Sequence, residues 1–159
     1  TANPVQPFAR HFADRTRAWL GTRPASGNPW LAQMWLGRFA GVTYPWLAQP
    51  RPPRAAPVEA VRGTMRELLA GATGSYDFVG LSNILDWCTP ADAAATLAAA
   101  WGALRPHGAV VVRQLNSTLD VRAAGPPFAW DAAGSATALA GDRSFFYRGL
   151  HIGWREGPP

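Results

Sequence analysis

The sequence predicts an α/β protein built around a parallel β–α–β unit. Two apolar segments, residues 76–81 and 109–113, have the length of strands, and their apolar content is too continuous for strands with one solvated face. A helix-start signal, Thr89-Pro90, opens the stretch between them. Because two strands joined through a helix pair in parallel with a right-handed crossover, these segments are expected to form one layered unit.

Length and composition are those of one folded domain. The chain has 159 residues, of which 48% are hydrophobic and 16% charged, so it can bury a core. No apolar run reaches the roughly 18 residues of a membrane-spanning helix, and the first residues do not resemble a signal peptide. A chain that begins Thr1-Ala2 rather than with Met is expected to be a fragment of a longer protein.

The charge pattern gives no strong indication of a partner. Fifteen basic residues, all of them Arg, face ten acidic ones, for a formal charge of +5. Attraction to nucleic acid or to anionic lipid head groups is one interpretation, and a GC-rich coding bias is the other. We favour the second and expect no nucleic-acid partner, because the arginines are scattered and never form a run of five.

Familiar ligand-binding motifs do not occur in the sequence. It contains no GxGxxG, GxxxxGK[ST] or HExxH pattern, so phosphate binding of the standard kind is not supported. The single cysteine, Cys88, excludes an internal disulfide and a CxxC metal motif. We expect a packing role for Cys88, no metal site, and a cytoplasmic location with a peripheral position at a membrane as the alternative.

The first 49 residues form a predicted helical segment. Aromatic and leucine side chains recur every three or four residues, which predicts amphipathic helices over about 6–20 and 29–39. Asn28-Pro29 supplies a cap and a first-turn proline for the second helix. The proline-rich residues 50–57 cannot be helical, and we expect an extended, exposed connector there.

The remaining residues, 58–159, form the predicted α/β region. Residues 58–61 are a short strand or the start of the next helix, which follows Thr64 over 65–69 and closes at 71–74. The strand 76–81 is expected in the centre of a sheet, and the helix after Thr89 extends to about residue 104.

The last part of the chain completes the expected sheet. Residues 105–108 are a predicted turn, residues 125–128 a loop and residues 131–140 a short helix. Two closing strands are expected at 145–148 and 151–154, around Gly149.

Polar side chains follow the two strands of the β–α–β unit, at Ser82-Asn83 and at Arg113-Gln114. Ligands of open α/β sheets bind at these carboxyl ends. In the loop that follows the first strand, Asp86 could hold an ammonium group or act as a base, and Trp87 could stack on a purine or shield a sulfonium. Helix capping by Asp86 and core packing by Trp87 are equally good interpretations.

Other candidate site residues carry weaker signals. Arg113 could clamp a carboxylate in a bidentate way, or it could be an ordinary surface side chain. His151 and Tyr147 lie in the expected final strands, where they could exchange a proton or serve only the structure.

These segments together resemble a known family. Residues 76–87, Tyr-Asp-Phe-Val-Gly-Leu-Ser-Asn-Ile-Leu-Asp-Trp, and residues 104–113, Leu-Arg-Pro-His-Gly-Ala-Val-Val-Val-Arg, resemble the fourth-strand to fifth-strand region of a class I methyltransferase fold. The pair Asp86-Trp87 is more selective. It resembles the betaine-lipid synthases, which move the 3-amino-3-carboxypropyl group of S-adenosylmethionine onto diacylglycerol.

Segments at both ends extend the resemblance over nearly the whole chain. Asn28-Pro29-Trp30-Leu31 and the aromatic residues after it resemble the helical insertion of that family. Asp142-Arg143 and Tyr147 resemble its C-terminal strand region. The resemblance implies a Rossmann-like, S-adenosylmethionine-dependent methyltransferase fold that is incomplete at the N-terminus, with residues 1–49 as the insertion and residues 58–159 as the C-terminal half.

The resemblance also implies roles for particular residues. Arg62, Gly63, Thr64 and Met65 would lie beside the adenine of S-adenosylmethionine, and Ser82 and Asn83 beside its methionine part. Asp86, Trp87, Arg113, Tyr147 and His151 would form the acceptor side, with Asp86 or His151 as the base that assists a diacylglycerol hydroxyl. Exposed Trp, Phe and Arg side chains of residues 8–54 would meet the membrane that holds this lipid, or would pack onto the missing half.

The chain departs from the family in two ways. Relatives carry an acidic residue where this chain has Asn83, and the family's first strand and glycine-rich loop lie upstream of the matched part. We therefore expect this chain alone to bind S-adenosylmethionine weakly or not at all, and we expect its sheet to have an unpaired edge. Two alternatives remain, a methyltransferase of the same fold with an unknown acceptor and an inactive fragment or partner-binding domain.

Overall fold

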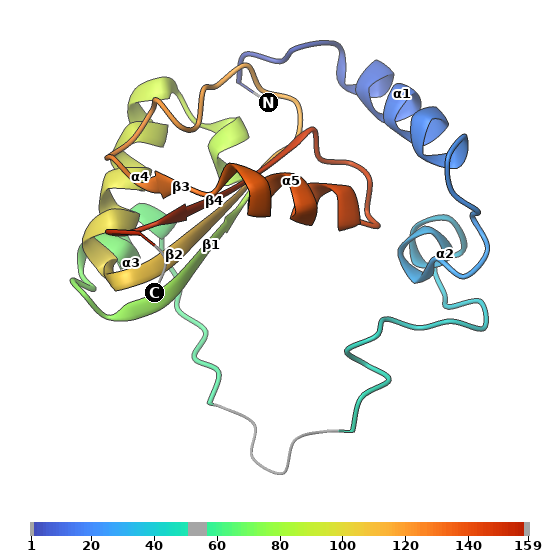
Figure 1. Ribbon diagram of the computed structural model, residues 1–159, viewed down its shortest axis with the longest axis horizontal. Coiled ribbons are helices and arrows are strands. Elements are labelled where there is room, and N and C mark those ends of the chain that lie inside the picture. Colours follow the sequence, from blue (N-terminus) through green and yellow to red (C-terminus); the bar gives the residue numbers. More distant parts are fainter. Residues whose placement is uncertain (1, 51–56, 158–159) are drawn as a thin grey trace.

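The computed structural model describes residues 2–50 and 57–157, which form an α/β structure with an open, mixed sheet of four strands in the order β1-β2-β4-β3 (Figure 1). The strands are β1 (Tyr76–Ser82), β2 (Leu104–Gln114), β3 (Ala129–Trp130) and β4 (Gly149–Trp154). The helices are α1 (Phe8–Leu20), α2 (Pro29–Leu36), α3 (Met65–Ala70), α4 (Pro90–Ala103), α5 (Ala132–Gly141) and the short 3-10 helix η1 (Ile84–Trp87). None of the helices in these ranges is long and apolar enough to cross a membrane.

The predicted β–α–β unit is confirmed. Strands β1 and β2 pair in parallel, with Val79 opposite Val110, and α4 connects them. Helix α4 begins as its sequence predicts, because the Thr89 side chain accepts a hydrogen bond from the Asp92 N–H and Pro90 occupies the first turn.

The expectation that β1 lies in the centre of a sheet is wrong for the described chain. Strand β1 is the outer strand, and its side chains alternate between buried and exposed along its second half. Val79 and Leu81 point into the core, whereas the Phe78 side chain is 60% exposed on the other face. Figure 1 shows β1 at the outer edge of the sheet. Apolar content alone could not reveal this, because it does not report which neighbours a strand has.

The predicted turn at 105–108 belongs to β2 instead. The strand begins at Leu104, directly after α4, and a register shift lies between the pairs Tyr76–Leu104 and Phe78–Ala109. His107 has a φ of 62° within this bulge. The irregular backbone needs Gly108, since a Cβ there would lie 2.9 Å from the Arg105 carbonyl oxygen.

The C-terminal strands differ from the prediction. The loop at 125–128 and the short helix are confirmed, the latter as α5 with Asp131 capping Gly134 N–H. The predicted strand at 145–148 is wrong, because those residues form a loop whose carbonyl groups bind side chains of α1. His11 Nε2 lies 2.8 Å from Phe146 O, and Arg15 Nε donates to Phe145 O at 2.8 Å. The outer strand is β3, which pairs antiparallel with β4.

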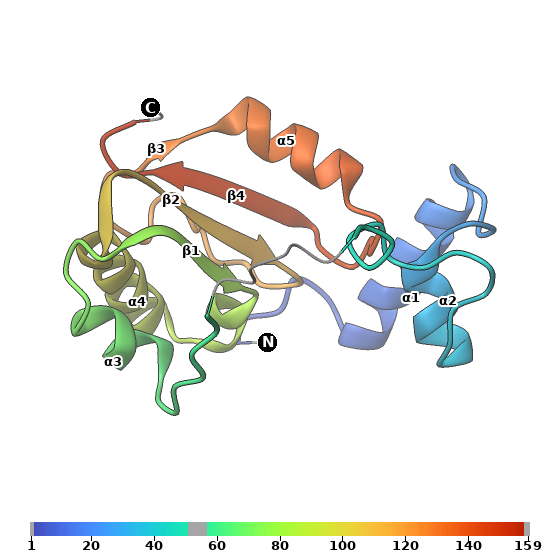
Figure 2. The ribbon, with the colours of Figure 1, turned by 90° about the horizontal axis from the view of Figure 1, so that it is seen from below.

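The two N-terminal helices are confirmed, and they attach to residues 139–147 rather than to the sheet. The Asn28 side chain caps α2, and its Nδ2 donates to Arg143 O at 3.2 Å. Helix α2 ends three residues earlier than expected, because Gly37 adopts a left-handed φ of 64°. Figures 1 and 2 show α1 and α2 together at one end of the molecule, beyond the sheet.

The segment before α3 is extended and exposed. No strand forms at 58–61, and Val58 is 95% exposed there, because this segment pairs with no strand of the described sheet. Helix α3 follows as predicted, with a capping box formed by Thr64 and Glu67. Most of the predicted connector at 50–57, namely residues 51–56, lies outside the described residues.

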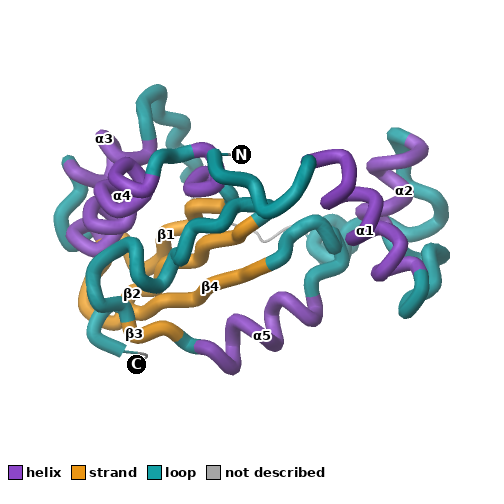
Figure 3. Tube along the Cα trace, turned by 90° about the horizontal axis from the view of Figure 1, so that it is seen from above, coloured by secondary structure: helices purple, strands orange, loops and turns teal. Residues whose placement is uncertain are grey.

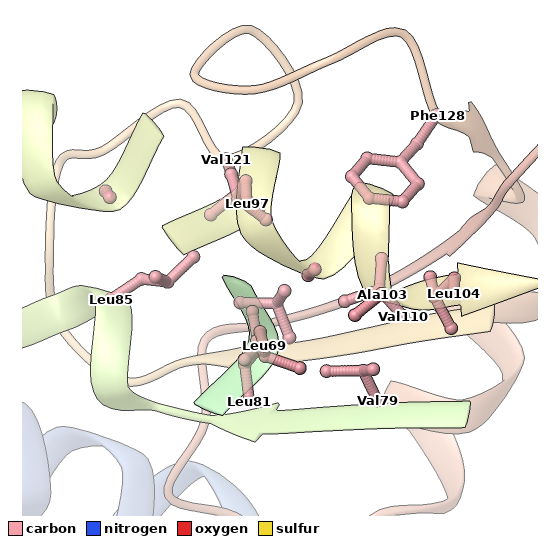
Figure 4. Close-up of a cluster of buried hydrophobic side chains, with 13 residues drawn as sticks. Leu69, Val79, Leu81, Leu85, Leu97, Ala103, Leu104, Val110, Val121 and Phe128 are labelled. Atoms are coloured by element: carbon pink, nitrogen blue, oxygen red, sulfur yellow. The ribbon is translucent and has the colours of Figure 1, made fainter. Parts of the chain in front are cut away.

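The core lies between the sheet and the pair α3 and α4 (Figure 4). Leu97 of α4 and Val110 of β2 are fully buried in it, and Phe128 closes it from the loop before β3. Helix α5 packs along β4 on the opposite side of the sheet, as Figures 2 and 3 show. The core therefore holds β1 and β2 rigidly, so that the loops at their carboxyl ends have a fixed base.

Candidate functional site

The carboxyl ends of β1 and β2 form one polar edge of the sheet. Ser82 ends β1, Gln114 ends β2, and Gly149 at the start of antiparallel β4 pairs with Gln114. Asp86 lies four residues after Ser82, and His151 lies two residues after Gly149. We call the set of residues 82–86, 113–118 and 147–151 the polar edge.

Ser82 has a strained backbone. Its φ of 47° lies in the left-handed region, and the pairing of β1 with β2 shifts register between Gly80 and Ser82. A non-glycine residue in such a conformation costs on the order of 1–3 kcal/mol and is found most often at functional sites. The Ser82 side chain is exposed, and its only hydrogen-bond contact within the described residues is to Asn83 Oδ1 at 3.5 Å. Both side chains are therefore free to bind a ligand.

Asp86 has a different environment. It lies on η1, is 1% exposed, and its Oδ2 accepts a hydrogen bond of 2.5 Å from Leu115 N–H. Its backbone carbonyl accepts a second bond, of 2.7 Å, from Ala2 N–H. Asp86 caps no helix, but its carboxylate ties the loop after β1 to the residue that follows β2. This arrangement favours a structural role over that of an accessible base.

Residues 2–6 cover this part of the polar edge. Pro4 forms a β-bridge with Ser117, and Val5 N–H donates to Asn116 O at 2.8 Å. The Asn116 side chain, fully buried, donates to Gln6 O at 2.7 Å. Sequence reasoning missed this contact; the polar run Asn116-Ser117-Thr118, one residue beyond the end of β2, was the available signal.

His151 is held as a neutral imidazole. Gln114 Nε2 donates to Leu119 O at 2.7 Å, so Gln114 Oε1 is the atom that accepts from His151 Nε2, at 3.2 Å. This pairing assigns the proton to Nε2. Nδ1 keeps its lone pair, and it is buried without a partner among the described residues. Burial, and then the charge of Arg122, lower the pKa of His151, so the ring is uncharged at neutral pH.

Arg113 and Tyr147 lie together. The Arg113 guanidinium carbon is 5.4 Å from the centre of the Tyr147 ring, within the range of a cation–π contact. Arg113 is exposed, and Tyr147 is half-buried on the loop before β4. A stacked guanidinium keeps its N–H groups available for an anion.

Trp87 is exposed rather than part of the core. Its side chain is 57% exposed, and its ring centre lies 6.4 Å from that of Phe8, at the start of α1. The neighbouring Cys88 is half-buried against the core, where burial raises the pKa of its thiol. Cys88 is thus protonated and packed, whereas Trp87 presents a free aromatic face.

Residues 62–65 make no hydrogen bond to Ser82 or Asn83 of the polar edge within the described ranges. The Thr64 hydroxyl donates to Glu67 Oε2 at 2.7 Å and accepts from Glu67 N–H at 3.3 Å, so it serves the start of α3. The hydroxyl bond, and a second bond of 3.0 Å from Thr64 N–H to the same carboxylate, lower the pKa of Glu67. Arg62 and Gly63 are exposed.

The candidate residues therefore fall into two groups. Ser82, Trp87 and Arg113 are exposed and Asn83 is half-buried, whereas Asp86 and His151 Nδ1 are shielded. Across residues 2–50 and 57–157, His, Cys, Asp and Glu side chains form no cluster of three that could hold a metal ion. Comparison with protein-family models, with curated proteins and with solved structures found no match.

Proposed function

We propose that the chain forms the acceptor-side half of a Rossmann-like transferase that moves the 3-amino-3-carboxypropyl group of S-adenosylmethionine onto diacylglycerol. The observation that carries the proposal is the strained, exposed Ser82 at the carboxyl end of β1. Ligands of open α/β sheets bind at this position, and backbone strain is retained where function requires it.

The open edge of β1 supports the proposal that this chain is one half of a larger Rossmann-like domain. Strand β1 has one paired side, and Tyr76 and Phe78 are exposed on its uncovered face. An edge strand leaves backbone N–H and C=O groups unpaired, and with exposed aromatic side chains it tends to pair with another strand. In the proposed enzyme, further strands and a glycine-rich loop continue the sheet beyond β1, as in the Rossmann-like fold.

The residues present fit one part of the co-substrate. The Ser82 hydroxyl and the Asn83 amide can hydrogen-bond the carboxylate and ammonium of a methionine moiety; Ser82 is exposed and Asn83 is half-buried. Arg62 and Gly63 are likewise free to lie against the adenine, whereas the Thr64 hydroxyl already bonds Glu67. No group in residues 57–157 replaces the glycine-rich loop, so this fit covers the methionine side best.

The co-substrate supplies a sulfonium-activated carbon. In the transfer, the acceptor oxygen forms a bond to the γ-carbon of the methionine chain, the carbon–sulfur bond breaks, and methylthioadenosine leaves as a neutral thioether. The hydroxyl proton of the acceptor must pass to a base. We assign this role to His151, because its Nδ1 is unprotonated at neutral pH and has no partner among the described residues, whereas the Asp86 carboxylate binds Leu115 N–H. Nδ1 is buried, so the assignment requires that the side chains covering it move aside when the acceptor binds.

Trp87, Arg113 and Tyr147 are assigned to the acceptor side. The exposed Trp87 ring can pack on the glycerol and acyl part of a lipid, and its face attracts a cation such as the sulfonium. The Arg113–Tyr147 pair can bind the carboxylate of the group in transfer.

The proposal is tested by the nucleoside product that the complete protein encoded by the gene forms from S-adenosylmethionine and diacylglycerol in mixed micelles. Methylthioadenosine is expected. S-Adenosylhomocysteine would instead identify a methyltransferase, and the absence of both products would identify a non-catalytic domain; either result contradicts the proposal. In the same assay, His151→Gln should lower kcat by about 100-fold or more with little change in KM.

A further inference from the structure

Exposed apolar side chains gather on α2 and the segment after it. Helix α2 lies at the end of the molecule away from α3 and α4, as Figures 2 and 3 show. We call these side chains the α2 patch: Met34, Trp35, Leu36, Val42, Trp46 and Leu47, each between 41% and 66% exposed.

Contacts within this region connect side chains of the segment after α2 to the helix itself. Trp35, Leu36 and Val42 border the same hollow of about 530 Å³, whose other walls include Leu20 and Leu31. Trp46 stacks on Tyr44 with ring centres 6.0 Å apart, and Tyr44 in turn contacts Trp30 of α2 at 5.0 Å. A soluble surface rarely exposes so many large apolar side chains side by side, so a partner is expected to cover them.

The charges around the α2 patch indicate which partner this is. The sequence has no Asp or Glu between Asp14 and Glu59, whereas it has six Arg over the same stretch. Arg17, which pairs with Asp14 at 3.1 Å, borders a second hollow together with Met34 and Trp35, and Arg38 follows α2 in an exposed position. Asp14 is paired by both Arg10 and Arg17, so the charge beside the patch remains net positive. Apolar and Trp side chains flanked by an excess of Arg are the composition of surfaces that bind anionic membranes.

We infer that the α2 patch is a membrane-binding surface that inserts its apolar side chains into the interfacial region of an anionic bilayer. The inference rests on the proposed function only in that a diacylglycerol acceptor is held in a membrane; the patch itself requires no reaction. Trp35 and Trp46, each 66% exposed, are the principal anchors, and Arg17 and Arg38 lie at the level of the lipid head groups.

The test is co-sedimentation of the 159-residue chain with vesicles, without S-adenosylmethionine. The chain should bind equimolar phosphatidylcholine–phosphatidylglycerol vesicles and bind pure phosphatidylcholine at least about tenfold more weakly, with a loss of binding as salt is raised. Trp35→Glu should weaken binding about tenfold or more. Val58→Glu is the matched control, because it makes the same charge change at a position that is 95% exposed and outside the patch.

Three results would overturn the inference. The wild-type chain could fail to bind the anionic vesicles, or Val58→Glu could weaken binding as much as Trp35→Glu. The chain could also prove to be a dimer that Trp35→Glu converts to a folded monomer, which would assign the patch to a protein interface. Circular dichroism of each variant establishes that it is folded. Because no product is measured, failure here leaves the proposed transfer reaction separately testable.

Discussion

Replacing Asp86 by Ala tests whether the Asp86 carboxylate has a structural role in the folded chain. The substitution removes the acceptor of a 2.5 Å hydrogen bond from Leu115 N–H, and both residues are buried, at 1% and 6% exposure. A buried donor left without a partner costs about 1–3 kcal/mol, and a hydrogen bond to a charged group contributes about 1.5–3 kcal/mol. These figures describe the same loss, so we expect the free energy of unfolding to fall by about 2–3 kcal/mol.

The assay is urea unfolding followed by far-ultraviolet circular dichroism, with comparison of midpoints at an unchanged m value. Asp86→Asn keeps an oxygen acceptor for Leu115 N–H, so it should lose less than half as much stability as Asp86→Ala. Asp77→Ala is the control, because the Asp77 side chain is 80% exposed and its ion pair with Arg105 should contribute less than about 1 kcal/mol. The reasoning is refuted if Asp86→Ala is as stable as Asp77→Ala.

The remaining predictions concern the core, a titrating group and the co-substrate. Leu97→Ala should lower the free energy of unfolding by about 2–5 kcal/mol in the same urea assay, because Leu97 is fully buried; a loss below about 1 kcal/mol would mean that α4 does not pack as described. The pKa of His151 is lowered by burial, so the unfolded chain takes up a proton below about pH 6.5 that the folded chain does not. The free energy of unfolding should therefore be highest above that pH and should fall as the pH drops through the pKa of His151 in the folded chain. In His151→Gln this free energy should fall less steeply with pH. Equal slopes in the two proteins would contradict the burial of a neutral imidazole. Titration calorimetry of this chain with S-adenosylmethionine should detect no micromolar affinity. A micromolar affinity would show that the chain binds S-adenosylmethionine without a glycine-rich loop.

Local chemistry made the helices and the β–α–β unit predictable. Asn28 and Thr89 bind N–H groups two or three residues along the chain, so the hydrogen bonds that cap α2 and α4 are local. The same holds for the capping box of α3, where Thr64 and Glu67 satisfy each other. Apolar content similarly identified β1 and β2 because both contribute side chains to one core.

Long-range contacts account for what the sequence did not reveal. The loop at 145–148 is not a strand because His11 and Arg15, more than 100 residues earlier, bind its carbonyl groups. The partner of Asp86 is Leu115, 29 residues away, and no periodicity reports such a pairing. The candidate site was thus predictable as a position at the carboxyl ends of the strands, but the accessibility of each side chain was not.

The proposed transfer is tested most directly by following two labels of S-adenosylmethionine in the complete protein with diacylglycerol. One sample carries the label in the carboxyl carbon of the methionine chain, and the other carries it in the S-methyl carbon. Transfer of the 3-amino-3-carboxypropyl group predicts that the carboxyl label enters the lipid fraction and the methyl label stays in water-soluble methylthioadenosine. Methyl label in the lipid fraction, or no label there from either sample, would contradict the proposed function.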